Sequence, residues 1–196
     1  MRKIKNIVIH HSVTPRELNI ETALNSFDNT HKIRLTDKYK QTNSGTKYEN
    51  IAYHYVIGEN GEVVNTRLDE KVGYHASNLS INNESLGICL CGNFDKQTPS
   101  IEQYKALRNL IKSLQEKYGK LNIYPHNKFA NKTCPGKYFD MSLALAGDYE
   151  FLFKTGECVG KSSILSDIKG WINKTSINKE LAYSILIMLE RINKEK

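Results

Sequence analysis

Two residues with metal-binding side chains stand eight positions apart in the segment PHNKFANKTCPG. His126 supplies an imidazole nitrogen and Cys134 a thiol, and both groups are good ligands for zinc. A catalytic zinc ion takes three protein ligands and keeps a further position open for water, which it activates near neutral pH. One histidine and one cysteine in a loop are more often structural than metal-binding. A zinc site here therefore needs a third ligand from elsewhere in the chain.

The third ligand is expected at the end of a short strand near the start of the chain. Lys5 to Ile9 is a β-branched run typical of a buried strand, and His10-His11 follows it directly. Successive side chains of a strand point to opposite faces, so only one of these two histidines can face a given site. The local pattern does not decide which of them does.

The elements that must position these residues alternate between strands and helices. This alternation predicts an α/β fold with a mixed central β-sheet flanked by helices. Asn60-Gly61 indicates a tight turn between two strands, whereas Thr98-Pro99 and Gly119 indicate the start and the end of a helix. Besides the first strand, the predicted strands are Ile51 to Ile57, Val63-Val64, Leu86 to Leu90 and Leu121 to Tyr124, and the predicted helices are Asn19 to His31 and Thr98 to Tyr118.

The last part of the chain has a different pattern. Apolar residues recur at helical spacing in two segments after Cys158, which predicts two amphipathic helices. Two helices of this size rarely form a core of their own, so we expect them to bind the main domain, the target of the protein or a second copy of the chain. The predicted organisation is a main domain over residues 1–153 and a small helical C-terminal appendage over residues 158–196.

Composition and charge restrict the partners and the compartment. A net charge of +7 favours an anionic partner, and nucleic acid, an anionic cell-wall polymer and a membrane surface all meet that condition. No segment approaches the roughly 20 apolar residues that span a bilayer, and the apolar run Ile7 to Ile9 is too short for a secretory signal. We therefore expect a cytoplasmic protein without a membrane span, whose four cysteines are reduced thiols.

Four segments occur in an order and at a spacing that resemble a known family. They are VIHHSVT, AYHYVIGENGEV, GYHASNLSINNESLGICLCGNF and PHNKFANKTCPG. Together they resemble the type 2 N-acetylmuramoyl-L-alanine amidases, a group that includes small phage lysozymes and the peptidoglycan-recognition proteins. The resemblance covers about residues 4 to 146 and leaves the C-terminal helices unmatched. Four ordered segments are far more specific than any one of them.

The resemblance implies a role for individual residues. The zinc ligands of the family fall on His10, His126 and Cys134. Its active-site tyrosine falls on Tyr53, and Lys132 matches the lysine found two positions before the cysteine in the phage-type members. The lysine would stabilise the charge that develops on the carbonyl oxygen, and the tyrosine would position the water or pass a proton to the leaving amine. Which of the two is the acid stays open.

Other residues have less specific interpretations. His75 matches a family position near the substrate cleft, and a histidine that is merely packed is an equally good interpretation. Cys89 stands where some relatives have a glutamate, which speaks against a carboxylate base and gives more weight to Tyr53 and Lys132. Buried structural roles are expected for His11, His54, Cys89 and Cys91, and His31 is expected to be solvated.

The resemblance implies a zinc-dependent amidase that cleaves peptidoglycan between the lactyl group and the first L-alanine. Together with the expected lack of an export signal, it implies a phage or prophage endolysin that stays in the cytoplasm until a holin-type pore lets it reach the cell wall. Peptidoglycan is then the partner, no nucleic acid is expected, and the C-terminal helices are candidates for homo-oligomer formation. The main alternative is a peptidoglycan-recognition protein that binds without cutting. A regulatory contact with another protein is a third possible function, and no residue in the sequence supports it.

Overall fold

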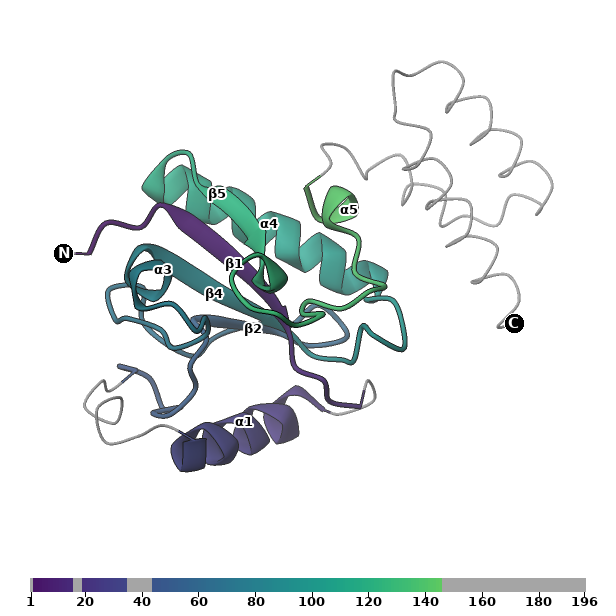
Figure 1. The fold of residues 1–196 in the computed structure, drawn as a ribbon. Coiled ribbons are helices and arrows are strands. Elements are labelled where there is room, and N and C mark those ends of the chain that lie inside the picture. Colours follow the sequence, from purple (N-terminus) through teal and green to yellow (C-terminus); the bar gives the residue numbers. More distant parts are fainter. Residues whose placement is uncertain (1, 16–18, 35–43, 146–196) are drawn as a thin grey trace, which may run out of the picture. The chain divides into compact units, whose positions relative to one another are not determined.

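A five-stranded mixed β-sheet forms the centre of the structure (Figure 1). The computed structural model describes residues 2–15, 19–34 and 44–145. The predicted domain boundary and the C-terminal helices lie outside these residues and stay predictions. The strands are β1 (Asn6–His11), β2 (Tyr55–Ile57), β3 (Val63–Asn65), β4 (Ser85–Leu90) and β5 (Asn122–Pro125), and the helices are α1 (Ile20–Arg34), α3 (Leu79–Glu84), α4 (Ile101–Tyr118), the short 3-10 helix η1 (His126–Lys128) and α5 (Met141–Leu145).

The strands lie in the order β3-β2-β4-β1-β5. The pairs β2–β4, β4–β1 and β1–β5 are parallel, and β3 pairs antiparallel with β2. The central strands β1 and β4 are buried at every residue, as expected for parallel strands that are covered on both faces, which is why their middle residues are continuously apolar. The mixed sheet with its helices confirms the predicted fold class.

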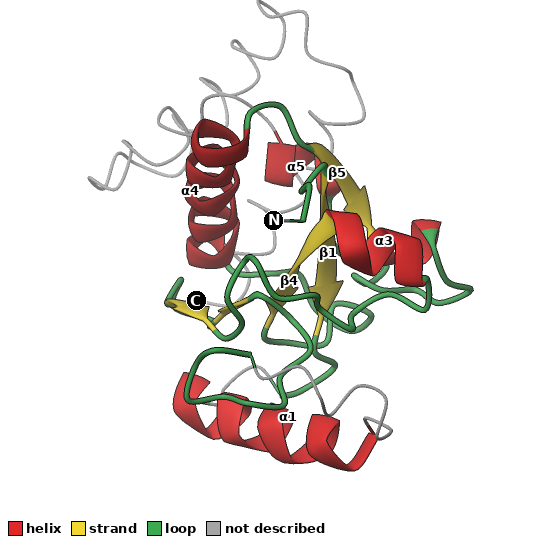
Figure 2. Ribbon diagram, turned by 90° about the vertical axis from the view of Figure 1, so that its left-hand side faces the viewer, coloured by secondary structure: helices red, strands yellow, loops and turns green. Residues whose placement is uncertain are grey.

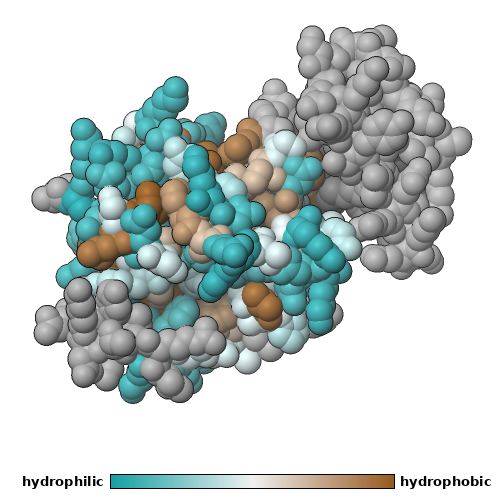
Figure 3. Space-filling view, viewed as in Figure 1, coloured by the Kyte–Doolittle hydropathy of each residue, from teal (hydrophilic) through white to brown (hydrophobic). Residues whose placement is uncertain are grey.

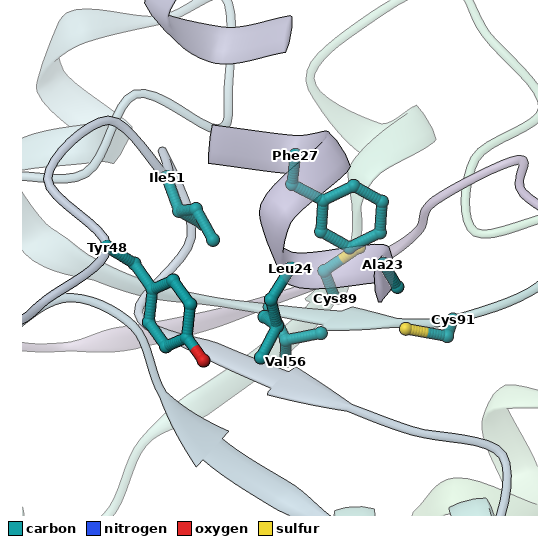
Figure 4. Packing of buried hydrophobic residues seen from close by; sticks show 8 residues of the cluster. All are labelled: Ala23, Leu24, Phe27, Tyr48, Ile51, Val56, Cys89 and Cys91. Carbon is teal, nitrogen blue, oxygen red and sulfur yellow. The ribbon is translucent and has the colours of Figure 1, made fainter. Parts of the chain in front are cut away.

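Helices cover both faces of this sheet (Figure 2). On the face towards α1, buried side chains of that helix pack against β2 and against two cysteines at and beyond the end of β4 (Figure 4). Both cysteines are almost completely buried, which confirms their interpretation as core residues on one face of a strand. The cluster consists of Ala23, Leu24, Phe27, Tyr48, Ile51, Val56, Cys89 and Cys91.

A chain of aromatic contacts joins the opposite face to α4. The ring centroids of Tyr104 and Phe139 are 5.4 Å apart, and those of Phe139 and Phe94 are 6.0 Å apart. The ring of Phe94 in turn lies 5.9 Å from that of His11. His11 therefore belongs to the α4 side of the sheet, and the preceding residue must face the α1 side because side chains alternate along a strand.

Helix α4 begins later than the sequence pattern predicts. Ser100, not Thr98, is the N-cap: its hydroxyl accepts the N–H of Gln103 at 3.0 Å, and the Gln103 side chain accepts the N–H of Ser100 at 3.0 Å. This reciprocal arrangement satisfies two N–H groups at the helix start, which Thr98 cannot do from outside the first turn. Gly119 ends the helix as predicted, with a φ of +78° that favours glycine.

Other element boundaries also differ from the prediction. The strand predicted over Ile51 to Ile57 is only three residues long, Tyr55–Ile57. The N–H of His54 still donates to the carbonyl oxygen of Gly87, but the carbonyl oxygen of Ala52 accepts the N–H of Tyr74 in a loop. Helix α3 was not predicted, since LSINNE has no repeated apolar face. It depends instead on Asn78, whose side chain caps the N–H of Ile81 at 3.2 Å.

Hydrophilic residues cover much of the face that Figure 3 shows, and hydrophobic residues form smaller patches between them. The most exposed large hydrophobic side chains in the described ranges, Val13 (58 % exposed) and Leu79 (54 %), come from different parts of the fold. Isolated apolar groups of this kind are common on protein surfaces. Within the described part of the chain, no helix has the length and apolar character that crossing a bilayer requires.

Candidate metal centre

His10 and His126 are brought together by the pairing of β1 with β5. The two strands are parallel, and Ile9 stands opposite Pro125. The residues that follow, His10 and His126, therefore lie side by side at the carboxyl ends of the strands, and their ring centroids are 4.4 Å apart. His10 is 1 % exposed and His126 is 7 % exposed, so both rings are shielded from bulk water.

Cys134 reaches the same place through the loop after β5. The backbone N–H of Asn127 donates to the carbonyl oxygen of Cys134 at 2.8 Å, which brings the loop back to η1. Sγ of Cys134 lies 3.8 Å from Nδ1 of His10. The candidate ligand atoms of His10, His126 and Cys134 all lie within 4.8 Å of one another. The structure thus places the three expected ligands in one buried group.

Asp95 fixes the loop on both sides of Cys134. One carboxylate oxygen accepts the hydroxyl of Thr133 at 2.6 Å, and the other accepts the backbone N–H of Lys137 at 3.0 Å. These two hydrogen bonds lower the pKa of Asp95, so the carboxylate that holds the loop stays ionised at neutral pH. The sequence pattern did not single out this residue, because its partners lie about 40 positions away.

The Cys134 thiol is protonated at neutral pH unless a cation lies beside it. Burial raises its pKa to about 11, although the N–H of His11 and the positive charge of Lys132 both oppose this shift. The His11 N–H donates to Sγ at 3.5 Å, a contact that suits a thiolate better than a neutral thiol. A metal ion would supply the missing positive charge, because coordination deprotonates a thiol.

Both imidazoles are uncharged in this environment. Burial lowers the pKa of His10 well below its ordinary value, and burial likewise lowers the pKa of His126. Nε2 of His126 is buried and has no hydrogen-bond partner among the described residues. Because a buried polar atom without a partner is costly, this nitrogen fits a metal ligand. Two uncharged imidazoles and a thiol are a donor set that zinc accepts, so the residues present fit a zinc ion.

His75 lies behind His10. Its Nδ1 is 3.1 Å from Nε2 of His10, and its Nε2 is 3.3 Å from the hydroxyl of Ser85. The side chain is 7 % exposed, and burial lowers its pKa well below the ordinary value. The structure therefore places His75 in contact with an expected ligand. Direct contact with substrate, the role expected from the resemblance, stays a prediction.

Tyr53 borders the centre on its α1 side. Its ring centroid lies 5.1 Å from that of His10 and 5.5 Å from that of His31, and its hydroxyl shares a hydrogen bond with the thiol of Cys89. The expectation that His31 is solvated is wrong: its Nδ1 accepts the N–H of Ala52 at 3.2 Å. His31 thus supports the residue that precedes Tyr53, a contact between α1 and a loop that no local pattern reveals.

Lys132 lies on the exposed part of the ligand loop. Burial is the main cause of the lowered pKa of His126, and the positive charge of Lys132 lowers it further. The same charge opposes the rise in the pKa of Cys134 that burial causes. The ammonium group is therefore close enough to the centre to act on charge there. Its backbone N–H donates to Ala130 at 2.8 Å, which keeps this part of the loop in a tight turn.

Two other histidines have structural roles. Nδ1 of His11 accepts the N–H of Phe94 at 3.1 Å on the α4 side of the sheet, so His10 rather than His11 faces the centre. Nδ1 of His54 accepts the N–H of Gly87 at 2.9 Å, and the side chain of His54 is completely buried. Both observations confirm the interpretation of these two residues as buried and structural.

Comparisons with known proteins agree with this geometry. A family model described as N-acetylmuramoyl-L-alanine amidase matches residues 1–137. The chain is 34 % identical to the endolysin of Escherichia phage T7 over 98 residues, which cover 46 % of this chain and 61 % of that protein. It is 30 % identical to peptidoglycan-recognition protein 1 of Holotrichia diomphalia over 116 residues, which cover 56 % and 51 %. The chain thus spans less than two thirds of the length of these curated relatives.

Solved structures show the same fold. The N-acetylmuramoyl-L-alanine amidase LysC from Clostridium intestinale aligns with a TM-score of 0.60 at 25 % identity, covering 73 % of this chain and 83 % of that one. The Drosophila peptidoglycan-recognition protein SD aligns with a TM-score of 0.56 at 23 % identity, covering 71 % and 78 %.

Proposed function

Because the chain belongs to the type 2 N-acetylmuramoyl-L-alanine amidase family, we propose that it is a zinc-dependent amidase. Its reaction is hydrolysis of the amide bond between the lactyl group of the peptidoglycan sugar and the first L-alanine of the stem peptide. The observation that carries this proposal is the convergence of His10, His126 and Cys134, whose candidate ligand atoms lie within 4.8 Å of one another.

The three ligand residues have the charge and the shielding that the proposed centre needs. Two uncharged imidazoles and one thiolate would hold the ion, leaving a position for water. When bound, zinc activates water near neutral pH and polarises an amide carbonyl. The His11 N–H at 3.5 Å from Sγ stabilises the thiolate form of Cys134. Burial keeps His10 and His126 uncharged, so one nitrogen of each ring has a lone pair for the metal.

Tyr53 and Lys132 would act on the substrate beside this group. The exposed Lys132 would stabilise, through its ammonium group, the negative charge that develops on the amide oxygen during attack. The ring of Tyr53 lies 5.1 Å from that of His10, and its hydroxyl would position the water or give a proton to the leaving amine. Cys89, which shares a hydrogen bond with Tyr53, stands where some relatives have a glutamate, so we expect no carboxylate base at this position.

We propose peptidoglycan as the partner and a phage or prophage endolysin as the biological role. The phage T7 relative that the chain resembles is an endolysin, and a net charge of +7 suits an anionic wall polymer. Binding without cleavage, as in a recognition protein, is the alternative that an experiment must separate from cleavage.

Digestion of purified peptidoglycan separates these possibilities. The full chain loaded with zinc should release stem peptides with a new amino-terminal L-alanine, detected by amine labelling and mass spectrometry, without new reducing sugar ends. The Cys134→Ser variant should release none, and chelation followed by zinc addition should remove and restore the activity. New reducing ends would indicate a glycosidase instead. Retention of the chain on the wall without new amino termini would indicate a recognition protein.

A further inference from the structure

A series of three hydrogen-bonded side chains runs from the candidate centre to helix α3. Nε2 of His10 lies 3.1 Å from Nδ1 of His75. Nε2 of His75 lies 3.3 Å from the hydroxyl of Ser85, and that hydroxyl donates to the carbonyl oxygen of Ile81 at 2.6 Å. His10, His75 and Ser85 are all buried, so water does not replace these contacts.

The direction of each hydrogen bond follows from the number of protons available. A serine hydroxyl has one proton, and Ser85 gives it to Ile81. Towards His75 the hydroxyl can therefore only accept, so Nε2 of His75 carries a proton. An uncharged imidazole has one N–H, which leaves Nδ1 of His75 as an acceptor. The proton of the bond between the two rings then belongs to Nε2 of His10.

From this order we propose that His75 is a positioning residue that selects the tautomer of His10, leaving the lone pair of Nδ1 to face the metal. The proposal rests on the proposed zinc site. Nδ1 is the nitrogen of His10 that lies 3.8 Å from Sγ of Cys134. Histidine ligands of metals usually donate their second N–H to a neighbouring acceptor, which fixes both the tautomer and the ring orientation.

Two glycines provide the space in which the His75 ring lies. A Cβ atom at Gly87 of β4 would stand 2.5 Å from two ring carbons of His75, and one at Gly73 would stand 2.9 Å from a ring carbon. Distances below 3.0 Å require one of the groups to move. A rigid ring hydrogen-bonded at both nitrogens cannot yield at low cost. The backbone therefore lies close to the His75 ring, which is also hydrogen-bonded at both nitrogens, and a residue that orients another one requires such close support.

The protonated nitrogens can be observed in the unaltered full-length chain. Two-bond ¹⁵N–¹H correlation spectra of the histidine rings, recorded with and without zinc, should show a proton on Nε2 of His10 and on Nε2 of His75. Zinc should shift the Nδ1 signal of His10. A His10 ring that carries its proton on Nδ1, or that binds zinc through Nε2, would overturn the proposal without any variant.

Variants provide an independent measurement, the dissociation constant for zinc in competition with a chromophoric chelator. His75→Leu should weaken zinc binding by about 10- to 100-fold. His75→Asn, which places an amide oxygen close to the position of Nδ1, should recover part of that loss. The matched control is Gln103→Leu, because Gln103 is also buried and its side-chain amide donates to the carbonyl oxygen of Cys91 instead of to a member of the His10–His75–Ser85 series. It should destabilise the fold and leave zinc affinity unchanged.

Ser85 provides a second pair of test and control variants. Ser85→Ala should weaken zinc binding in the same direction as His75→Leu, whereas Ser44→Ala, at another completely buried serine, should not. Equal zinc affinity in His75→Leu and the wild type would contradict the proposal. Zinc bound through Nδ1 of His10 without release of stem peptides that begin with L-alanine would instead remove the proposed amidase function and leave this inference standing.

Discussion

Sγ of Cys134 lies 3.8 Å from Nδ1 of His10, although 124 positions separate the two residues in the chain. The contact forms only when β5 has paired with β1 and the loop after β5 has folded back. A ligand from each end of the domain therefore enters one centre, and neither can be replaced by a near neighbour in the sequence.

Replacement of Cys134 by serine should abolish stoichiometric zinc binding at neutral pH. The change removes the thiolate, the anionic ligand of the proposed set, while keeping the size of the side chain. Metal analysis of the purified proteins after dialysis measures the effect. Cys91→Ser is the control, because Cys91 is also buried but lies in the core cluster beside α1. A zinc-loaded Cys134→Ser protein would show that the metal has other ligands.

Removal of the Lys132 charge should slow cleavage by about 100-fold or more, because a charged donor near the developing oxyanion is lost. Lys132→Met and Lys132→Arg should differ, the arginine retaining more activity since it keeps the charge. Zinc content should stay unchanged in both. Lys128→Met tests a lysine of the same loop whose ammonium lies over the ring of Tyr124 at 3.7 Å. An equal loss of cleavage rate in Lys128→Met would indicate that both lysines act by binding the wall, and not by stabilising the oxyanion.

Loss of the Tyr53 hydroxyl in Tyr53→Phe should lower the turnover rate by about 100-fold or more, the usual contribution of a positioned proton-transfer group. Zinc affinity should stay at the wild-type value because the hydroxyl is not one of the expected ligands. The matched variant is Tyr55→Phe, whose hydroxyl donates to Asp69 at 2.7 Å. It should lose about 1 kcal/mol of stability and keep its turnover rate. Full activity in Tyr53→Phe would exclude the proposed role.

Stability of the metal-free protein should decrease as the pH falls from about 6.5 towards 3. Burial, and then the charge of Arg2, lower the pKa of His54 from 6.5 to about 3. In this pH window the unfolded chain binds a proton at His54 and the folded chain does not, so acid favours unfolding by about 1.4 kcal/mol per pH unit for each such histidine.

His10 and His75 contribute in the same direction, so the comparison that isolates His54 is the variant His54→Gln. Urea unfolding at a series of pH values, with a chelator present, gives the free energy of unfolding as a function of pH. The slope of this dependence reports the protons taken up on unfolding, and it should correspond to about one proton fewer in the variant. Identical slopes for the two proteins would mean that His54 is already protonated in the folded state.

The sequence predicted the sheet and the identity of the grouped residues more closely than it predicted the element boundaries. β1 and β4 are short apolar runs with little ambiguity, and the Asn60-Gly61 turn joins β2 and β3 where expected. The resemblance selected His10 over His11, and the structure shows the reason: His11 is turned to the α4 side, where its ring accepts the N–H of Phe94.

The supporting contacts could not be predicted because they depend on register. Ser85 and His75 meet only after α3 has formed and β4 has joined the sheet, and LSINNE has no apolar repeat that would predict α3. Asp95 likewise holds the ligand loop through residues 38 and 42 positions away. Hydrogen bonds of this kind are specified by tertiary structure and have no signal in local spacing.

The pairing of Ile9 with Pro125 also has a consequence for folding. A slip of β5 by one residue would turn His126 to the other face of the sheet, so only the native register completes the ligand group. β5 is the last strand in chain order, and its docking closes the longest loop of the sheet. The rate of metal uptake during refolding would thus report the rate at which β5 pairs with β1. Probes of helix formation would report a separate, more local step.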